Sequence, residues 1–501
     1  MVIFPFKSLD SRVSNMSSVC HWRGHWNATL GQCVCEFPYA LPRCESIDPI
    51  AATKTVNAKS PQGNMRPQRK SQRKLEKHRA VDEHYNAEGQ SLPTCSEECS
   101  AHEELYEGIE NDLAPFLIKG GITREMLSEA HDKWGSSGIM APIMIHDGQM
   151  YLTKPCHGTE PVAHSDPMLQ STLNLILDLL QDQNVETFPN VDLIINADDY
   201  GRVFMDRNDS RLLPILSITR VNGRMADILY PTGDYTNGKP GDRIRKLTYN
   251  IGRNTHQYLY SSPWEQKKEV GFFRGRPNTH SRSRLALSRI SLEHQDLLDI
   301  GLVHYREEHD WFCHIGHEKP LTELPAVPFD KHLDYKYLVS LDGHSYSHRL
   351  LRILSLNSLV LKEESREVEF YYHMLRPFEH YVPFSYSVDL TTYKMRDVRT
   401  NITETVKWLR RNDALARKIA LQGQKLAHTH LCDAARRCYV ERLLRRYATT
   451  MTFRPTLSMY PHAYLVEDRN VFRTGVPPSH CARRQNFQVS QGLLINSKKL
   501  N

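Results

Sequence analysis

Apolar residues in the first half of the chain recur at two spacings, one typical of helices and one of strands. Within residues 103–119 they lie three or four positions apart, which predicts an amphipathic helix that the Gly120–Gly121 pair ends. Residues 168–180 predict a second helix. The short run 191–196 is rich in Ile, Leu and Val and is bounded by turn residues. It predicts a buried strand, and residues 226–230 are a further strand candidate.

The second half of the chain alternates strand, turn and helix. The predicted strands are residues 270–273, 337–341, 358–361 and 380–384. The predicted helices between them are residues 283–290, 347–356 and 368–374. This repetition predicts a parallel sheet with helices on its faces. Two long helices follow over residues 404–428 and 433–448, and we assign no element to the weakly patterned residues 451–501.

Hydropathy and length argue against a membrane-spanning protein and for more than one domain. The longest apolar stretches, residues 138–145 and 173–180, fall well short of the roughly 20 residues that cross a bilayer. The chain has 501 residues, 40% of them hydrophobic and 24% charged, as in folded proteins of two to three domains. We therefore expect no membrane span.

The formal net charge of +6 is concentrated in one polar segment. Residues 51–80 hold nine Lys or Arg and one acid, a balance of +8, so the rest of the chain sums to -2. Because this stretch has almost no large apolar side chains, we interpret residues 51–92 as a basic disordered linker. A patch for nucleic acid or another polyanion is the alternative, and we expect no nucleic-acid partner.

Cysteine spacing in the first hundred residues favours disulfides. Cys33 and Cys35 are followed by Cys44, a spacing similar to the end of an EGF-like module, so residues 1–50 are interpreted as an EGF-like remnant. A zinc site is the competing interpretation, but a paired Cys-x-x-Cys set is absent. Disulfides indicate an oxidising compartment, although the first residues lack the apolar core of a readable signal peptide and the last are not KDEL-like.

Three polar loops follow predicted strands of the second half, where ligands of parallel α/β sheets bind. They are residues 272–284, 342–349 and 362–365. Backbone N–H groups that open a helix, together with arginine, form an anion site, and we assign Arg274 and Arg349 to it. Arg276 and Arg284 are predicted to be solvated surface residues.

The sequence motifs of the chain limit the classes of ligand that this anion site could bind. The chain contains no P-loop, no Gly-x-Gly-x-x-Gly dinucleotide motif and no Gly-x-Ser-x-Gly elbow of serine hydrolases. The remaining interpretation is a nucleotide diphosphate whose phosphates are held by arginine.

A pair of carboxylates, Asp198 and Asp199, follows the predicted strand 191–196. Such a carboxylate can act as a general base, hold a divalent metal, or cap a helix or turn. Neighbouring carboxylates in an extended segment point to opposite sides and make a poor joint clamp for a metal. We therefore expect one of the two to face the ligand site.

Several segments together resemble glycosyltransferase family 90, which includes protein O-glucosyltransferases and capsule-associated xylosyltransferases. The resemblance covers about residues 103–448 and is strongest over 263–383. Its matching pieces, in chain order, are residues 192–200, 227–231, 263–275, 336–338, 343–349, 369–371, 375–383 and 438–448. Members usually have proline after the Asp-Tyr pair, where this chain has Gly201.

The resemblance implies an α/β fold of GT-B type, in which two Rossmann-like domains face a cleft. Residues 93–250 would form the acceptor-side domain and 251–450 the domain that binds the UDP-sugar, after a small Cys-containing N-terminal segment and before the unassigned tail 451–501. It also implies transfer of glucose or xylose from a UDP-sugar to a serine hydroxyl, often in EGF-like repeats, in the endoplasmic reticulum lumen. The anomeric centre is inverted, and neither a cofactor nor a metal is expected.

The resemblance also assigns roles to residues. Asp199 corresponds to the catalytic base, and Arg282 and Arg349 correspond to the pair that neutralises the departing diphosphate. Backbone amides of the segment that includes Gly343, Ser345 and Ser347 would assist the arginines, and Glu369 falls where related folds hold the ribose.

Three alternatives remain open at this stage. One is a capsule-type xylosyltransferase with a glycan acceptor. Another is a non-catalytic binding protein on the same fold, with the N-terminal segments as interaction regions. A metal-dependent GT-A enzyme is disfavoured because it would carry Asp-x-Asp rather than the adjacent Asp198 and Asp199.

Overall fold

A computed structural model describes most of residues 95–466 and four short strands near the N-terminus. The gaps in the main range are residues 136–138, 155, 158–159, 162–166, 182–187, 206–210, 232–260, 278–281, 305–320, 385–386, 389–394 and 397–400. The chain divides into two compact units, Met1–His78 and Arg79–Asn501. Among the described helices, none is long and apolar enough to cross a bilayer.

The first unit is described only through two antiparallel strand pairs. Strand β1 (Gly24–Asn27) pairs with β2 (Gln32–Cys35), and β3 (Tyr39–Ala40) pairs with β4 (Ser46–Ile47). They fall within the predicted EGF-like remnant, whose cysteine pairing lies outside the described residues. The predicted linker 51–92 also lies outside them.

The second unit begins with a six-stranded mixed sheet in the order β12-β10-β9-β5-β6-β21. Its strands are β5 (Met140–His146), β6 (Gln149–Leu152), β9 (Val191–Asn196), β10 (Ile215–Ser217), β12 (Ile228–Leu229) and β21 (Tyr464–Leu465). Strands β9, β10 and β12 run parallel, whereas β5, β6 and β21 add antiparallel pairs. Every residue of β9 is buried, as its continuous apolar run predicts.

Helices α2 (Glu103–Ile118), α3 (Arg124–Trp134) and α4 (Pro167–Gln181) accompany this sheet. The predicted helices 103–119 and 168–180 are confirmed almost to the residue, and α2 buries the four apolar positions of its predicted face. Helix α3 was not predicted from the sequence. Its N-cap is Thr123, whose hydroxyl accepts the Met126 N–H.

A second sheet has five strands, all parallel, in the order β14-β13-β15-β16-β18. They are β13 (Lys268–Gly275), β14 (Leu298–Leu302), β15 (Tyr335–Ser340), β16 (Leu359–Glu363) and β18 (Val382–Phe384). The predicted parallel sheet is therefore confirmed. In chain order these strands lie 2-1-3-4-5 across the sheet, the doubly wound arrangement that places ligands between its first and third strands.

Helices α6 (Arg282–Glu293) and α7 (Arg349–Leu354) follow β13 and β15, as predicted. The prediction of a helix over 368–374 is wrong. Instead β17 (Glu367–Val368) pairs with β11 (Arg220–Val221), and only the 3-10 turn Tyr372–Met374 is helical. The long-range strand pairing, which local spacing does not encode, overrides the helical pattern.

The helix predicted over 404–428 is also corrected, because the structure divides it into α8 (Ile402–Arg411) and α9 (Asp413–His430). Asn412 lies at the break with φ -123° and ψ 46°, and its side-chain amide donates to the Trp408 carbonyl at 2.8 Å. Such bonding of an Asn side chain to its own backbone competes with a continuing helix.

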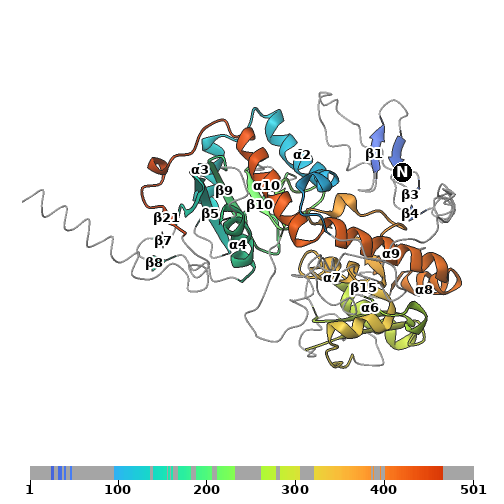
Figure 1. Cartoon of the computed structure of the whole chain (residues 1–501). Coiled ribbons are helices and arrows are strands. Elements are labelled where there is room, and N and C mark those ends of the chain that lie inside the picture. The colour runs from blue at the N-terminus through green and yellow to red at the C-terminus, as the bar shows by residue number, and fades with distance from the viewer. Residues whose placement is uncertain are drawn as a thin grey trace, which may run out of the picture. The chain divides into compact units, whose positions relative to one another are not determined.

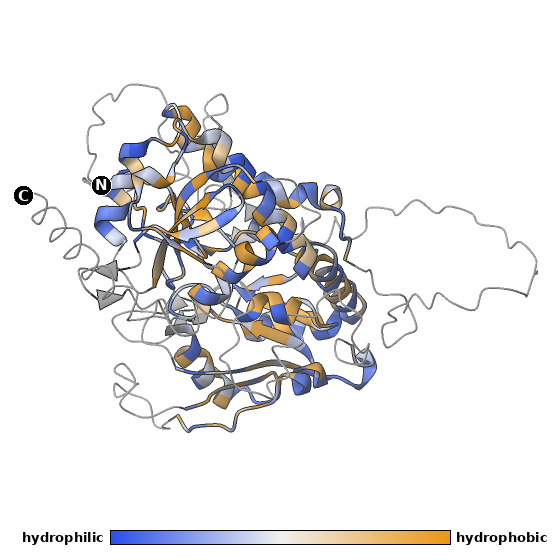
Figure 2. Ribbon diagram, turned by 60° about the vertical axis from the view of Figure 1, so that its left-hand side comes forward, coloured by the Kyte–Doolittle hydropathy of each residue, from blue (hydrophilic) through white to orange (hydrophobic). Residues whose placement is uncertain are grey.

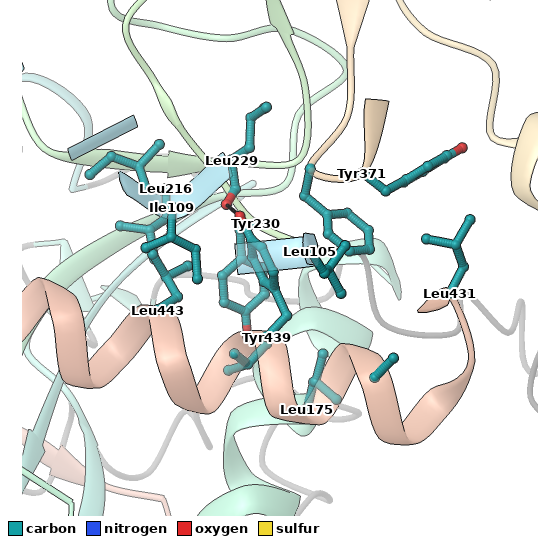
Figure 3. Packing of buried hydrophobic residues seen from close by; sticks show 14 of the residues in the cluster. Leu105, Ile109, Leu175, Leu216, Leu229, Tyr230, Tyr371, Leu431, Tyr439 and Leu443 are labelled. Carbon is teal, nitrogen blue, oxygen red and sulfur yellow. Dashed lines mark hydrogen bonds between the residues drawn. The ribbon is translucent and has the colours of Figure 1, made fainter. Parts of the chain in front are cut away.

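The last helix, α10 (Asp433–Thr450), returns to the first sheet after α9 has packed on the second (Figure 1). It lies against α2, α4 and β9, and its apolar side chains point at Leu229 and Tyr230 (Figure 3). The Tyr439 hydroxyl donates to the Leu229 carbonyl at 3.1 Å. In Figure 2 the strands of both sheets are mostly hydrophobic and the outer helix faces hydrophilic.

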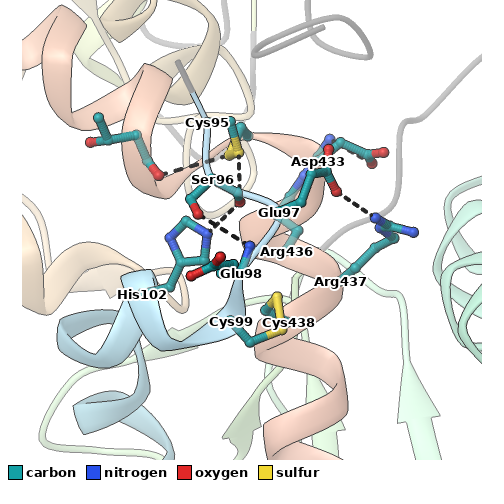
Figure 4. Close-up of a disulfide and its surroundings, with 12 residues drawn as sticks. Cys95, Ser96, Glu97, Glu98, Cys99, His102, Asp433, Arg436, Arg437 and Cys438 are labelled. Atoms are coloured by element: carbon teal, nitrogen blue, oxygen red, sulfur yellow. Dashed lines mark hydrogen bonds and ion pairs between the residues drawn. A yellow bond between two sulfur atoms is a disulfide. The ribbon is translucent and has the colours of Figure 1, made fainter. Parts of the chain in front are cut away.

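Two disulfides fasten the start of this unit to its last helices. Cys95 pairs with Cys432 and Cys99 with Cys438, across 337 and 339 residues of sequence, as Figure 4 shows for the second pair. The disulfides expected for cysteines of the first hundred residues are thus found for Cys95 and Cys99, whereas their partners Cys432 and Cys438 were not predicted. Connections of this length could not be assigned from sequence spacing.

The start of the unassigned tail belongs to the first sheet. Strand β21 extends the sheet beyond β6, and Met451 forms a parallel bridge with Ile122. The Tyr460 hydroxyl donates to the buried carboxylate of Asp192, and its ring stacks on His131. Residues 451–466 therefore complete the first sheet rather than extending away from it.

Candidate functional site

A cavity of about 540 Å³ opens where β13 and β15 end, the position that the strand order marks for a ligand. Its lining comes from the loops after β9, β13 and β15, from α6 and α7, and from residues just before β15. The lining residues are Asp199, Arg274, Arg276, Pro277, Arg284, Val327, Phe329, His332, Gly343, His344, Tyr346, Ser347, His348, Arg349 and Arg352. Five arginines against one carboxylate make this a site for an anion.

Arg349 begins α7 and is the buried cation of the cavity. Its Nη2 donates to the Arg274 carbonyl at 2.5 Å, and its guanidinium lies 4.4 Å from the centre of the Phe273 ring. Among the described residues, its Nη1 has no hydrogen-bond partner. Burial, followed by the nearby Arg284 and Arg352, lowers the pKa of Arg349 to about 9. No carboxylate of the described part of the chain forms an ion pair with it, so the site has positive charge that an anion would offset.

Arg284 corrects a sequence prediction, because it is partly buried and lines the cavity. Its guanidinium donates to the carbonyls of Arg276 and Leu341 at 3.0 and 3.3 Å. Burial lowers its pKa, against the opposing effect of Asp342 and Glu363. The helical turn of α6 directs this side chain inward, which a list of loop arginines could not reveal. Arg276 is exposed, as predicted, but also reaches the cavity wall.

Arg274 lines the cavity but is largely engaged in holding its own strand. Its Nη2 donates to the Asp299 carboxylate at 2.5 Å, and its Nη1 donates to the carbonyls of Phe273 and Asp299. These bonds fix the guanidinium at the end of β13. The residue thus contributes charge to the cavity while its geometry is set by Asp299.

The loop after β15 supplies Gly343 and Ser347 to the cavity wall. The Gly343 N–H donates to the carbonyls of Ser345 and Tyr346 at 3.1 and 3.3 Å, which folds the loop into a tight turn. Ser345 is buried and is not part of the lining, and its hydroxyl has no hydrogen-bond partner among the residues that the structure describes.

One further predicted residue, Glu369, is not brought to the cavity, and the structure does not test another, Arg282. Arg282 is the first residue of α6, and its side chain lies outside the described atoms. Glu369 is buried and accepts from the Tyr371 hydroxyl at 3.3 Å. Burial raises the pKa of Glu369 to about 8, so at neutral pH this carboxyl is mainly protonated.

Asp199 reaches the same cavity from the end of β9, whereas Asp198 does not. Asp198 forms an ion pair with Arg202 and accepts the Asp199 N–H at 2.7 Å. Asn196 stabilises the turn, because its amide donates to the Tyr200 carbonyl at 2.8 Å. One carboxylate of the pair is therefore presented to the cavity and the other is used to hold the loop.

Asp227 anchors the far side of this loop. It is buried and accepts the N–H groups of Arg202 and Val203 at 2.7 and 2.9 Å, together with the Ser217 hydroxyl at 2.6 Å. Gly201 packs so closely here that an added Cβ would lie 2.9 Å from the Asp227 carboxylate. This contact gives a physical reason for glycine at position 201.

Sequence reasoning did not assign the remaining polar groups of the wall. The Tyr346 hydroxyl lies 2.7 Å from His348 Nε2, and burial and Arg352 lower the pKa of His348 to about 4. Burial lowers the pKa of His332 to about 3. Both imidazoles are therefore neutral at neutral pH. Arg352 could have been found from its position one helical turn after Arg349.

Among the residues that the structure describes, no group of three or more His, Cys, Asp or Glu side chains is arranged to hold a metal ion. The polar character of the cavity comes from its arginines and histidines, the loop hydroxyls and Asp199.

Comparison with known proteins identifies relatives along most of the chain. The model of glycosyl transferase family 90 matches residues 94–470. O-glucosyltransferase rumi of Drosophila pseudoobscura pseudoobscura is 29% identical, over 71% of this chain and 78% of the relative. Protein O-glucosyltransferase 3 of Rattus norvegicus is 29% identical over 67% and 60%. Protein O-glucosyltransferase 1 of Mus musculus is 26% identical over 73% and 84%.

Proposed function

The chain belongs to glycosyl transferase family 90 and is a glycosyltransferase, and from this premise we propose that it transfers glucose or xylose from a UDP-sugar to a protein serine. The observation that carries the proposal is the cavity, which joins buried cations at the ends of β13 and β15 to a single carboxylate from the end of β9. We further propose that the two sheets represent the two halves of a GT-B enzyme, with the donor on the second.

In the proposed reaction Asp199 is the general base. It accepts the proton of the serine hydroxyl while the serine oxygen forms a bond to the anomeric carbon. The bond between that carbon and the diphosphate oxygen breaks, and UDP leaves with the electron pair. Attack from the side opposite to the leaving group inverts the anomeric centre.

The cationic groups stabilise the leaving diphosphate in this proposal. Arg349 lies in a low-dielectric site and has no carboxylate partner in the described part of the chain, so its attraction for a developing negative charge is only weakly screened. Arg284 and the loop residues Gly343 and Ser347 line the same cavity. Arginine then supplies the charge stabilisation that other enzymes obtain from a metal, and we propose that none is needed, nor any cofactor.

Different observations support the proposed acceptor and the proposed donor sugar. Relatives named O-glucosyltransferases favour a protein acceptor, and an EGF-like repeat is proposed from the sequence resemblance. The two described disulfides favour an oxidising compartment such as the lumen of the endoplasmic reticulum. Glucose and xylose differ by one hydroxymethyl group, which is worth about 1–3 kcal/mol in a pocket, so both donors remain in the proposal.

The test is a donor screen with the purified chain in excess EDTA. UDP-glucose, UDP-xylose and UDP-N-acetylglucosamine are each offered with a folded EGF repeat, and the mass of the repeat is measured afterwards. We expect addition of a hexose or a pentose. Saturable UDP binding without transfer would overturn the proposed acceptor and favour a glycan acceptor or a binding role. Absence of UDP binding would overturn the donor site itself, and turnover that EDTA abolishes would overturn metal independence.

Neighbouring carboxylates provide a matched pair of variants for the base. We expect D199N to lower kcat by about 10²–10⁴-fold with the affinity for UDP unchanged, because the variant keeps the shape of the site but cannot accept the proton. We expect D198N to stay within a few-fold of the parent, since the asparagine oxygen can still accept the Asp199 N–H and residue 198 does not line the cavity. Equal losses in both variants would contradict the assignment of Asp199.

A further inference from the structure

Two carboxyl groups that the proposed reaction does not use lie where β15 and β16 end. Glu363 is the last residue of β16 and is buried, and Asp342 begins the loop that carries Gly343 to the cavity. Neither residue is part of the cavity lining. The charge of Asp342 raises the pKa of Glu363, so the ionisation of each carboxyl depends on that of the other.

Glu363 connects the two segments that carry the cavity arginines. Its Oε2 accepts the Asp342 N–H at 3.0 Å, directly before the loop that leads to Arg349. The same oxygen accepts the Ser283 hydroxyl at 3.0 Å, in the first turn of the helix that carries Arg284. One carboxyl oxygen therefore holds the loop after β15 against the start of α6.

The charged groups around this pair come from several elements. Burial and then Asp342 raise the pKa of Glu363 to about 7, and Lys362 of β16 opposes them. Burial raises the pKa of Asp342, while Lys362 and Arg284 favour its ionised form. The buried Lys362 amine also donates to the Glu363 carbonyl at 3.1 Å.

Two more carboxyls and three histidines lie near the Glu363–Asp342 pair or line the cavity. Burial and then Asp342 raise the pKa of Glu367 to about 7, and the Glu369 carboxyl described above titrates near 8. His332 and His348 stay neutral above pH 5, and His344 lines the cavity. Glu367, Glu369 and the histidines are present in every protein compared, so a comparison of variants at Glu363 removes their direct contribution. Asp342 is not removed in this way, because its charge and that of Glu363 depend on each other.

We propose that Glu363 is a positioning residue that aligns the loop after β15 with helix α6 and, through its own charge, makes the affinity for the sugar-nucleotide depend on pH. The proposal deepens the proposed function and rests on it. The described bonds to the side chain all use Oε2, so a proton on Oε1 leaves the link between loop and helix intact. Ionisation then changes the field in the cavity rather than its geometry.

The direction of the pH effect follows from the sign of the charge. Below pH 7 the neutral acid leaves the positive potential of Arg284 and Arg349 undiminished, and the anionic donor binds more tightly. Above pH 7 the carboxylate opposes these arginines. A unit charge about 10 Å from a phosphate, at an effective dielectric constant of about 20, changes an affinity about tenfold.

The experiment measures the Kd of UDP-glucose by calorimetry between pH 5.5 and 8.5 for the full chain and two variants. UDP-glucose is suitable because both ends of its diphosphate are esterified, so its charge is constant over this range. E363Q keeps a carbonyl oxygen that can accept both bonds but cannot ionise. We expect the ratio of the Kd of the parent to that of E363Q to rise from about 1 at pH 5.5 to about 10 at pH 8.5.

E363L removes the acceptor and tests the geometric part of the proposal. We expect it to bind UDP-glucose at least about tenfold more weakly than E363Q at every pH, because the Asp342 N–H and the Ser283 hydroxyl lose a charged or polar partner. The control is E293Q, the same change at an exposed position near the end of α6, which should match the parent throughout. Thermal melts of all four proteins check that each is folded.

The outcomes separate the inference from the function on which it rests. A parent protein that binds UDP-glucose with a ratio to E363Q that does not change with pH overturns the role of the Glu363 charge. Equal affinities of E363L and E363Q overturn the role of its hydrogen bonds. A folded parent that binds neither UDP-glucose nor UDP-xylose at any pH overturns the proposed function as well.

Discussion

Replacing Arg349 by methionine should make the free protein more stable and at the same time remove its response to UDP. The side chain is buried without an ion-pair partner among the described residues, and its guanidinium lies near two other arginines. A pKa lowered from 12.5 to about 9 corresponds to a penalty of at most about 5 kcal/mol for charging the residue in the folded state. Methionine fills a similar volume without the charge.

The gain is reduced by the contacts that the substitution removes. Arg349 donates one charged hydrogen bond to the Arg274 carbonyl and lies over the Phe273 ring, and together these are worth about 2–4 kcal/mol. The expected net effect of R349M is therefore an increase of about 1–3 kcal/mol in the free energy of unfolding at pH 7.5. UDP, which would offset the charge in the parent, should raise the melting temperature of the parent but not of R349M.

The pH dependence gives a second test of the same reasoning. Below pH 9 the Arg349 guanidinium is charged in both the folded and the unfolded state, so its lowered pKa destabilises the fold by the full amount. As pH rises through about 9 the folded state loses this charge, and the destabilisation decreases. The advantage of R349M in urea unfolding should therefore shrink between pH 8 and pH 10. R366M, which removes an exposed arginine, serves as the control and should match the parent.

Two results would refute this account of Arg349. A loss of more than about 2 kcal/mol in R349M would show that the charge is already compensated in the free protein. A melting shift with UDP that persists in R349M would show that Arg349 does not contact the diphosphate.

Two further predictions concern the support of the site. G201A places a Cβ within 2.9 Å of the Asp227 carboxylate and should displace the loop that presents Asp199. We therefore expect kcat, measured from initial rates, to fall at least about tenfold, while the Kd of UDP, measured by calorimetry, is unchanged. C438S opens the link to Cys99 and should lower the free energy of unfolding by about 2–5 kcal/mol in urea, whereas equal stability in reduced and oxidised parent protein would contradict a stabilising role.

The sequence predicted those features that depend on neighbours along the chain. The run 191–196 is buried on both faces, so its apolar continuity was sufficient to predict β9. The alternation of strands and helices in 270–361 predicted the parallel sheet, because each crossover is a short local unit. Arg274 and Arg349 could be selected because ligand-facing loops follow strand ends in such a sheet, whereas Asp199 was distinguished from Asp198 only by the family resemblance.

Features that need a distant partner were decided only by the tertiary structure. Pairing with β11 turned the predicted helix 368–374 into β17 and a 3-10 turn, and the disulfides join residues 337 and 339 positions apart. The burial of Arg284 and the link through Glu363 depend on how α6 packs against the sheet. Local spacing determines which face an element presents, but the contact energy that orders the site comes from segments far apart in the chain.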